Sequence, residues 1–298
     1  MPEGDTIAWA AARIRPVLEG RVPDEVRTPH PRHRMDHWPQ RLAGRAVTGV
    51  LTYGKHLFLA FDGDLVIHSH LRMTGAWAVY DSGGRWGRSP RRAWLVLRCG
   101  GRDVVQFDGP VLELLTERRA ALPPARHPGS PSGLPPARHP ASPDRAAPES
   151  SGWAAAASSG WFDQRLAALG PDILAPEFDS GRFLRRLRAD DPTRGVGDAL
   201  LDQRTVAGIG NMWKAEGCWE AGVDPWREVR AVSDVAVLEI IELVRPRMLR
   251  SAQLGPRAIQ PRVYGLVGRP CPRCGVAIRS GGQGDENRTT YWCPGCQT

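Results

Sequence analysis

The most informative structural pattern in this chain is the stretch Leu200-Leu201-Asp202-Gln203-Arg204-Thr205-Val206-Ala207-Gly208-Ile209-Gly210-Asn211-Met212-Trp213. It predicts a helix that runs into two glycines, followed by a second helix that Asn211 caps. Glycines allow close backbone approach, and a helix N-terminus presents unpaired N–H groups and positive dipole charge. The turn is therefore a candidate anion site, and the net charge of +8 of the chain makes a DNA phosphate the expected anion. A glycine C-cap followed by an asparagine N-cap in a plain helical hairpin explains the same residues equally well.

Helical periodicity surrounds this turn, from Trp161 to about Leu254. Helices are expected near residues 180–190, 195–207, 211–221 and 233–251. We therefore assign residues 161–260 to a helical domain.

The first part of the chain has a different pattern, in which short apolar runs are punctuated by glycines. The runs expected to form strands are Ala46 to Leu51, Leu57 to Phe61, Leu65 to His68, Ala76 to Tyr80, Trp94 to Arg98 and Val104 to Phe107. Their spacing predicts a compact antiparallel sandwich or barrel. We assign residues 1–118 to this N-terminal domain.

Between these two regions the composition changes abruptly. Residues 119–160 contain nine prolines, and Leu-Pro-Pro-Ala-Arg-His-Pro occurs twice, at 122–128 and 134–140. Such a composition cannot bury a core, so the segment is expected to be a disordered linker or insertion.

The chain opens with Met1-Pro2-Glu3-Gly4-Asp5. Removal of Met1 would expose the secondary amine of Pro2, and α-amino groups ordinarily titrate at about pH 7.7–8. Condensed with an aldehyde, this amine gives an iminium that has no N–H to lose, so its positive charge persists as an electron sink. Glu3 beside it is a candidate general acid or base. The alternative is a frayed terminus ahead of an ordinary helix.

A helix is expected directly after this terminus, since apolar residues recur at helical spacing from Ile7 to Leu18. Thr6 or Asp5 is the expected N-cap. The amine would then lie near the positive end of the helix dipole, which disfavours its protonated form.

Two loops of the strand region contain candidate ligand-binding residues. In Tyr53-Gly54-Lys55-His56, the lysine could reach a phosphate or could be a solvated turn residue. Farther on, His68 and His70 share one strand face, which makes a metal pair conceivable, although no third ligand is evident nearby. Met73 at the next loop tip could act as a wedge between bases or belong to the core.

Four of the six cysteines form the pairs Cys271-Pro-Arg-Cys274 and Cys293-Pro-Gly-Cys296, with eighteen residues between them. This spacing is typical of a closed tetrahedral Cys₄ zinc site, which is structural rather than catalytic. Arg288 is expected near the tip of the zinc-bound hairpin, as a DNA contact or as part of a solvated basic turn. Cys99 and Cys218 stand alone and are expected to be buried.

Composition favours a polyanionic partner. The 298 residues have a net charge of +8, and of 40 Lys and Arg residues only Lys55 and Lys214 are lysine. Arginine pairs bidentately with phosphate, which points to nucleic acid. A GC-rich genome would explain the ratio of arginine to lysine but not the net charge. No apolar run approaches the ~18 residues of a membrane span, and no signal sequence is evident.

In kind and order, four of these features resemble the formamidopyrimidine-DNA glycosylase/endonuclease VIII family. They are the opening Pro2-Glu3-Gly4, the Tyr53–His56 loop, the Gly208–Asn211 turn and the terminal cysteines. The resemblance covers nearly the whole chain except the linker and is greatest to actinobacterial endonuclease VIII-like enzymes. It implies an α+β, two-lobed fold: an antiparallel β-sandwich with an N-terminal helix, a helix–two-turn–helix domain, and a zinc-finger hairpin at 261–298.

The resemblance also implies a bifunctional DNA glycosylase/AP lyase that flips the damaged nucleotide out of the duplex. Pro2 would attack C1′ and displace the base, and Glu3 would donate the proton that opens the sugar. Successive β and δ elimination would then cut the strand on both sides. The remaining residues carried over are phosphate contacts at Lys55, Asn211 and Arg288, the wedge Met73, and DNA contacts at His70, Arg72 and Tyr264.

Some positions depart from the family pattern. Asp5-Thr6 replaces a common Pro-Glu, so a second carboxylate near the amine is missing, with Asp5 as a possible substitute. Phe107-Asp108-Gly109-Pro110-Val111 lacks the Arg-x-Phe wedge of the formamidopyrimidine branch, which favours oxidised pyrimidines over 8-oxoguanine as substrates. Leu266 stands where a basic residue is common.

The implied partner is double-stranded DNA with oxidised bases or abasic sites, bound by a monomer in the bacterial cytoplasm, at the nucleoid and away from membranes. One alternative is a family member that binds damaged DNA without cutting it. A second is a metal-dependent nuclease that uses His68 and His70.

Overall fold

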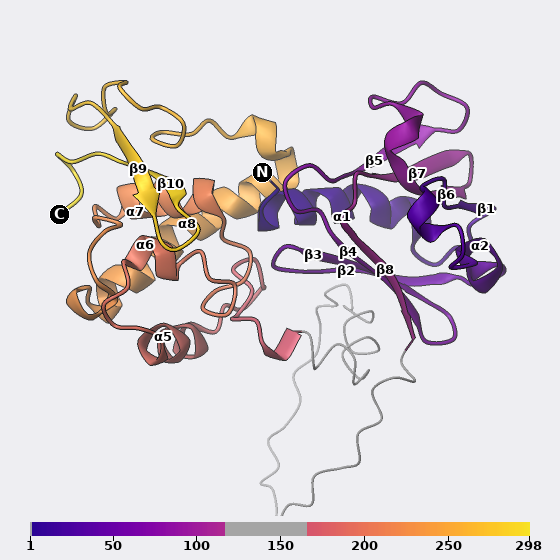
Figure 1. Cartoon of the computed structure of the whole chain (residues 1–298), viewed down its shortest axis with the longest axis horizontal. Helices are drawn as coiled ribbons and strands as arrows, with labels where there is room; N and C mark the ends of the chain where they lie inside the picture. Colours follow the sequence, from indigo (N-terminus) through magenta and orange to yellow (C-terminus); the bar gives the residue numbers. More distant parts are fainter. Residues whose placement is uncertain (1, 117–165) are drawn as a thin grey trace, which may run out of the picture.

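The structure, a computed structural model, describes residues 2–116 and 166–298. Figure 1 shows two lobes joined where helix α1 (Gly4–Leu18) begins, with β-strands in one lobe and mostly helices in the other. The expected linker at 119–160 lies outside the described residues. Within the described part of the chain, no helix is long and apolar enough to cross a membrane.

Two antiparallel four-stranded sheets form the N-terminal lobe. One sheet has the order β2-β3-β4-β8 and the other β1-β6-β7-β5. All six expected strands are present, and the bounds of the eight strands are β1 Glu25–Arg27, β2 Val47–Tyr53, β3 His56–Phe61, β4 Leu65–His70, β5 Ala76–Asp81, β6 Ala93–Cys99, β7 Arg102–Phe107 and β8 Val111–Thr116. Strand β8 was not expected, because leucine and glutamate favour helices; its pairing with β4 makes it a strand.

The core of this lobe lies between the two sheets and is closed by α1. Ile7, Ala10, Ile14 and Leu18 are at most 5% exposed and pack in one cluster with inward-facing residues of both sheets. The predicted periodicity is therefore that of a helix with one buried face. A short helix, α2 (Trp38–Leu42), adds the buried Trp38 to the same cluster.

In the described part of the second lobe, the helices labelled in Figure 1 pack with a hairpin. The helices are α5 (Ser180–Ala189), α6 (Val196–Ala199), α7 (Asn211–Glu220) and α8 (Asp234–Leu254), and the hairpin pairs β9 (Arg279–Gln283) with β10 (Arg288–Trp292). Trp213 of α7 is fully buried in the helical core, and β10 of the hairpin packs against α7. This places the N-terminus of α7 between the helical core, the hairpin and the first lobe.

The expected helix over 195–207 is wrong, because α6 ends at Ala199 and turns follow. Side-chain hydrogen bonds compete with the helix here. The Asp202 carboxylate accepts the N–H of Arg204 at 2.8 Å, and the Gln203 side chain donates to the carbonyls of Leu201 and Ile209. These local bonds hold the backbone in turns up to the glycines.

Candidate DNA-binding and catalytic site

Glu3 links the two lobes. Its carboxylate is 3% exposed and accepts the backbone N–H groups of Gly210 and Met212, each at 2.9 Å. Next to it in the chain, Gly4 donates its N–H to the carbonyl of Gly208 at 2.9 Å. A Cβ on Gly210 would lie 2.3 Å from the Glu3 carboxyl carbon, so only glycine fits. The half-buried Pro2 is thereby held at the junction of the lobes.

This arrangement corrects three expectations. The helix after the terminus begins at Gly4, so neither Asp5 nor Thr6 is its N-cap. Asn211 is the first residue of α7 rather than its cap, and its side chain donates to the carbonyl of Thr289 at 2.6 Å. The N–H groups of Gly210 and Met212, at the start of α7, are bonded to the Glu3 carboxylate, so the anion at this turn in the structure is Glu3.

Asp5 is buried as well, but its side chain points elsewhere in the junction. The hydroxyl of Ser251 on α8 donates to the Asp5 carboxylate. Burial raises the pKa of Asp5. The carboxylate therefore ties the start of α1 to α8.

Lys55 lies in the β2–β3 hairpin, which is docked against the second lobe. The Gly54 N–H donates to Asp172 at 3.0 Å, and the Tyr53 hydroxyl donates to the carbonyl of Gly170 at 2.7 Å. Gly54 has φ 54°, and a Cβ there would lie 2.8 Å from that of Ala207. These contacts hold the lysine close enough to Glu3 and Arg288 for their charges to interact.

Arg288 is the first residue of β10, at the tip of the β9–β10 hairpin as expected. Its guanidinium pairs with Glu286, with Nε and Nη2 at 2.8 and 2.5 Å from the carboxylate. Lys55 and Arg288, from opposite lobes, line one cavity of about 430 Å³. The cavity is also lined by Gln203, whose side chain bonds to the backbone of Gly208 and Ile209.

Tyr264 also lies at the junction, beside the β9–β10 hairpin. Its N–H donates to the buried carboxylate of Glu216, and its ring centroid lies 5.1 Å from that of Tyr291 on β10. Burial raises the pKa of the Tyr264 hydroxyl, and the Glu3 carboxylate adds to the effect. Of the carried-over residues, Glu3, Lys55, Asn211, Tyr264 and Arg288 are therefore brought together at the junction.

The turn that follows β4 contains the other three candidates. His70 ends β4, and its Nδ1 accepts the N–H of Arg72 at 3.2 Å. Arg72 has φ 49° and is exposed. Met73 is 63% exposed, so it is not a core residue. This turn presents an unbranched apolar side chain to solvent.

His68 is hydrogen-bonded to a histidine other than His70. Its Nε2 is hydrogen-bonded to Nδ1 of His56 at 2.9 Å. In residues 2–116 and 166–298, the one group of side chains arranged to hold a metal ion is Cys271, Cys274, Cys293 and Cys296.

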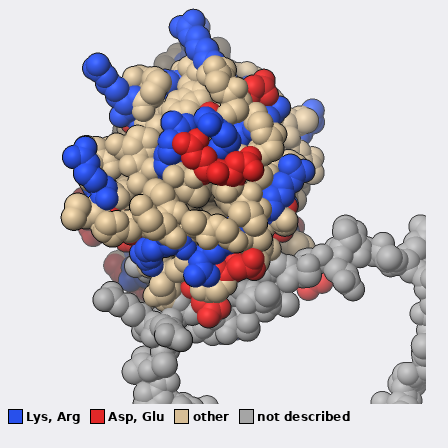
Figure 2. All heavy atoms as spheres, turned by 90° about the vertical axis from the view of Figure 1, so that its right-hand side faces the viewer, with Lys and Arg blue, Asp and Glu red and all other residues tan. Residues whose placement is uncertain are grey.

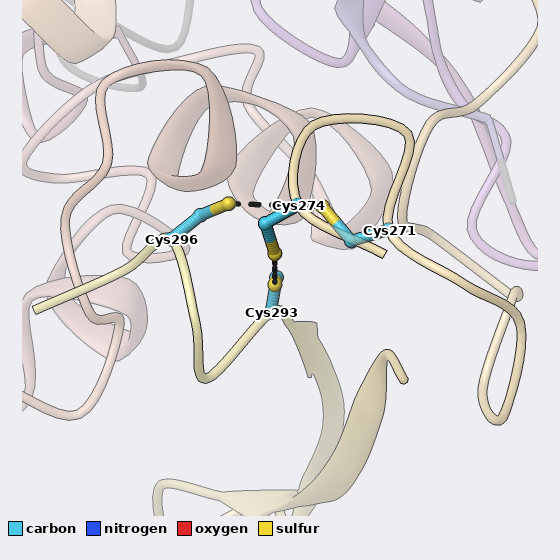
Figure 3. A group of neighbouring side chains, drawn as sticks. All are labelled: Cys271, Cys274, Cys293 and Cys296. Atoms are coloured by element: carbon cyan, nitrogen blue, oxygen red, sulfur yellow. Dashed lines mark hydrogen bonds between the residues drawn. The ribbon is translucent and has the colours of Figure 1, made fainter. Parts of the chain in front are cut away.

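The four cysteine sulfur atoms converge in the structure (Figure 3), and all lie within 4.8 Å of one another. The Cys271–Cys296 and Cys274–Cys293 sulfur separations are 3.7 and 3.4 Å. Tetrahedral zinc with Zn–S bonds of about 2.3 Å requires sulfur separations of about 3.8 Å. The donor set therefore fits the predicted zinc ion. Cys99 and Cys218 are buried, as expected.

Burial shifts the pKa values of the groups at the junction. It raises the pKa of Glu3, and the Lys55 ammonium and the N–H groups of α7 oppose the shift only in part. It lowers the pKa of Lys55, an effect that Glu3 opposes and Arg288 increases. The pKa of His70 falls to about 4, first through burial and then through the charges of Arg72 and Lys55. The histidine is therefore neutral at pH 7.

Lys214 is a residue of this region that the sequence did not indicate. Its side chain is fully buried, and Nζ donates to the Thr290 hydroxyl at 2.5 Å. Burial lowers its pKa to about 8. Asp172 and Glu286 were also missed. The available signal for Lys214 was its rarity, since it is one of two lysines in the chain.

The end of the N-terminal lobe that faces away from the junction carries charges of both signs (Figure 2). Figure 2 shows that basic side chains on this face are scattered and interspersed with acidic ones. The fold and the junction thus define a class: two-lobed proteins in which the N-terminus lies at the junction, close to a lysine of one lobe and an arginine of the other.

Comparison with known proteins identifies the particular family. Residues 1–110 match the model of the formamidopyrimidine-DNA glycosylase N-terminal domain, and residues 169–260 match that of its H2TH domain. The probable endonuclease 8 2 of Streptomyces coelicolor is 36% identical, over 100% of this chain and 94% of its own. The DNA-(apurinic or apyrimidinic site) lyase Nei2 of Mycolicibacterium smegmatis is 33% identical, over 100% of this chain and 99% of its own.

Solved structures show the same fold. The formamidopyrimidine-DNA glycosylase of Lactococcus lactis, bound to DNA with an AP site, superposes with a TM-score of 0.74 at 20% identity, with 100% of each chain covered. The chain therefore belongs to the formamidopyrimidine-DNA glycosylase/endonuclease VIII family, and the expected two-lobed fold is confirmed.

Proposed function

We propose that this protein is a bifunctional DNA glycosylase/AP lyase of base excision repair. The observation that carries the proposal is the bonding of Glu3 to the start of α7, which fixes the Pro2 amine at the junction between the lobes. Lys55 and Arg288 lie at the same junction. An amine nucleophile, a buried carboxyl group and two cations for phosphates are the groups that the reaction needs.

In the proposed mechanism, the Pro2 nitrogen attacks C1′ of the flipped nucleotide, and the base leaves with the bonding electrons. Glu3 donates the proton that opens the sugar ring. Its raised pKa suits this role, because a carboxyl group can donate only while it holds a proton. The resulting iminium acidifies the C2′ proton, and β and then δ elimination release both phosphates.

The other residues act on the DNA backbone and the base stack. Lys55, Asn211 and Arg288 hold phosphates around the lesion, with Tyr264 packed beside them. His70 acts as a neutral hydrogen-bond donor to a phosphate, because Arg72 N–H occupies its Nδ1 and leaves Nε2 to carry the proton. Met73 fills the space that the flipped nucleotide leaves.

Zinc held by the four cysteines would fix the hairpin that carries Arg288. The geometry supports a structural ion, since four thiolates complete its coordination. We expect one zinc per chain by metal analysis and loss of DNA binding when a strong chelator removes it. Full DNA binding by the metal-free protein would contradict this role.

The substrate proposed is duplex DNA with an oxidised pyrimidine or an abasic site, bound by a monomer in the bacterial cytoplasm. Asp108 and Gly109 support the choice of lesion, since they occupy the loop that carries the Arg-x-Phe wedge in the formamidopyrimidine branch. Rates on thymine glycol, dihydrouracil, 8-oxoguanine and abasic duplexes test this choice. A preference for 8-oxoguanine would overturn it.

Borohydride trapping on an abasic duplex tests the activity itself. A lyase gives a covalent adduct on the residue-2 peptide, and Pro2→Gly should lower strand cleavage by orders of magnitude with near-normal DNA affinity. Glu3→Gln should also lose base removal. Absence of an adduct with wild-type protein that still binds damaged DNA would instead support the non-catalytic alternative.

A further inference from the structure

The turn that presents Met73 is firmly fixed at its N-terminal end. Leu71 is 2% exposed, and its carbonyl accepts the N–H of Gly75 at 2.9 Å. A Cβ on Gly75 would lie 2.7 Å from that carbonyl oxygen, so the turn closes tightly on a glycine. Between these points, the carbonyl of Thr74 accepts a hydrogen bond from outside the turn.

Arg88 holds the other end of the turn. This residue lies in the loop between β5 and β6, and its Nη1 donates to the Thr74 carbonyl at 2.8 Å. The same Nη1 donates to Asp108 Oδ2 at 2.9 Å, and the guanidinium carbon lies 6.0 Å from the centre of the buried Phe107 ring. One guanidinium thus connects the β4–β5 turn to the end of β7.

Asp108 is itself held in place. Its carboxylate also accepts Nε of Arg92 at 2.8 Å, and its N–H donates to the Arg92 carbonyl at 3.0 Å. The Asp108 side chain is 18% exposed, against 34% for Arg88. Its backbone has φ 49°, which aspartate tolerates better than most residues. Three connections of the sandwich therefore meet at Arg88 and Asp108.

Inserting a side chain between stacked base pairs costs about a few kcal/mol of unstacking free energy. The base pairs that resist separation push back on the turn that carries the side chain. A turn held only at its base would bend away. We propose that Arg88, anchored by Asp108, is a positioning residue that keeps the Met73 turn rigid while Met73 enters the base stack. This inference rests on the proposed function and on the wedge role of Met73 within it.

The test uses the full-length protein and two duplexes. The first contains one dihydrouracil, for single-turnover base removal. The second contains a tetrahydrofuran abasic analogue opposite 2-aminopurine, whose fluorescence rises when wedge insertion disturbs its stacking. We expect Arg88→Ala to lower base removal about tenfold and to reduce the fluorescence rise, with DNA affinity changed much less. Arg88→Lys should restore most of both signals.

Arg91→Ala is the matched control, because it removes the same charge from an exposed neighbour in the same loop. It should leave both signals unchanged. Asp108→Asn leaves Arg88 in place but weakens its anchor, so it should reproduce a smaller form of the Arg88→Ala defect. Thermal unfolding of each variant identifies any general loss of folding.

Combination with Met73→Ala decides between positioning and direct DNA contact. If Arg88 acts through Met73, then Met73→Ala and the double variant cut at the same rate. A further loss in the double variant, or a salt dependence of binding reduced by one phosphate, would overturn the proposal. Equal rates of base removal for Met73→Ala and wild type would overturn both the wedge role of Met73 and the positioning role of Arg88. Wild-type protein that neither cuts nor is trapped would instead refute the proposed function.

Discussion

At the scale of single residues, Glu3 is a candidate that the sequence indicates but whose bonding partners lie far away in the chain. The carboxylate bonds to N–H groups more than 200 positions away in the chain, at the start of α7. A helix N-terminus favours a negative charge, whereas burial disfavours it. The pKa of Glu3 is raised, so burial is the stronger of the two effects.

The raised pKa of Glu3 makes stability depend on pH. The folded protein binds this proton more tightly than the unfolded chain does, so the stabilisation is present below the unfolded pKa and is lost as pH rises through the folded pKa. We expect the melting temperature of wild type, relative to Glu3→Gln, to increase as the pH is lowered from 7 toward about 4.5. Thermal unfolding across that range measures it, with Glu19→Gln as a carboxylate control. A constant difference would contradict the raised pKa.

The pKa of Lys55 is shifted in the opposite direction from that of Glu3. Its pKa is lowered, so the ammonium loses its proton at a lower pH than an exposed lysine would. A phosphate binds the protonated form, so the dissociation constant for DNA should increase as pH rises toward 10. Lys55→Arg should remove this dependence, because arginine stays charged. Fluorescence anisotropy from pH 7 to 10 compares the two proteins. Parallel curves would exclude Lys55 as the titrating contact.

At the scale of elements, the β9–β10 hairpin determines where the charged side chain of Arg288 lies. Its strands pair from Arg288–Gln283 to Trp292–Arg279, and Lys214 of α7 bonds to Thr290 within it. The hairpin tip carries Arg288, the proposed phosphate contact, which pairs with Glu286. A carboxylate next to a phosphate contact competes with that phosphate.

Two substitutions in this hairpin should therefore have opposite effects on DNA binding. Arg288→Ala should weaken binding and lower the salt dependence, d log K/d log [salt], by about 0.9, the value for one phosphate. Glu286→Gln should strengthen binding, because it removes the competing carboxylate. Titrations at several salt concentrations measure both variants, and Arg269→Ala, outside the hairpin, is a control for loss of charge. An unchanged slope for Arg288→Ala would contradict its assignment as a phosphate contact.

At the scale of the whole molecule, direct contacts fix the lobes relative to each other. The helices α1 and α8 pack together, and Gly54 docks against Ala207 and Gly208 of the other lobe. The proposed site lies at this junction, so its geometry depends on how the lobes fit.

Two glycine substitutions isolate the role of this fit. Gly54→Ala and Gly44→Ala both place alanine at a positive φ, 54° and 71°, so their backbone strain is similar. A Cβ added at Gly54 would lie 2.8 Å from the Cβ of Ala207. A Cβ added at Gly44 would have no neighbouring atom within 4 Å. We expect Gly54→Ala to lose about 1–3 kcal/mol more stability than Gly44→Ala and to lose activity as well. Thermal unfolding and base-removal rates measure this, and equal losses would mean that the junction tolerates the methyl group.

The sequence alone determined the elements whose signals are local. Short apolar runs between glycines marked six strands, apolar spacing marked α1, and the two Cys-x-x-Cys pairs marked the metal site, since each depends on neighbours within a few residues. The family pattern added the candidate residues at the site.

Only the tertiary structure decided which groups meet. Glu3 bonds to the start of α7, Asp172 holds the Lys55 hairpin, and Arg88 reaches Thr74 through contacts between separate elements. Strand β8 and the turns after α6 likewise depend on pairing and side-chain bonds that no periodicity records. Such contacts join residues far apart in the chain, where spacing carries no information about distance in space.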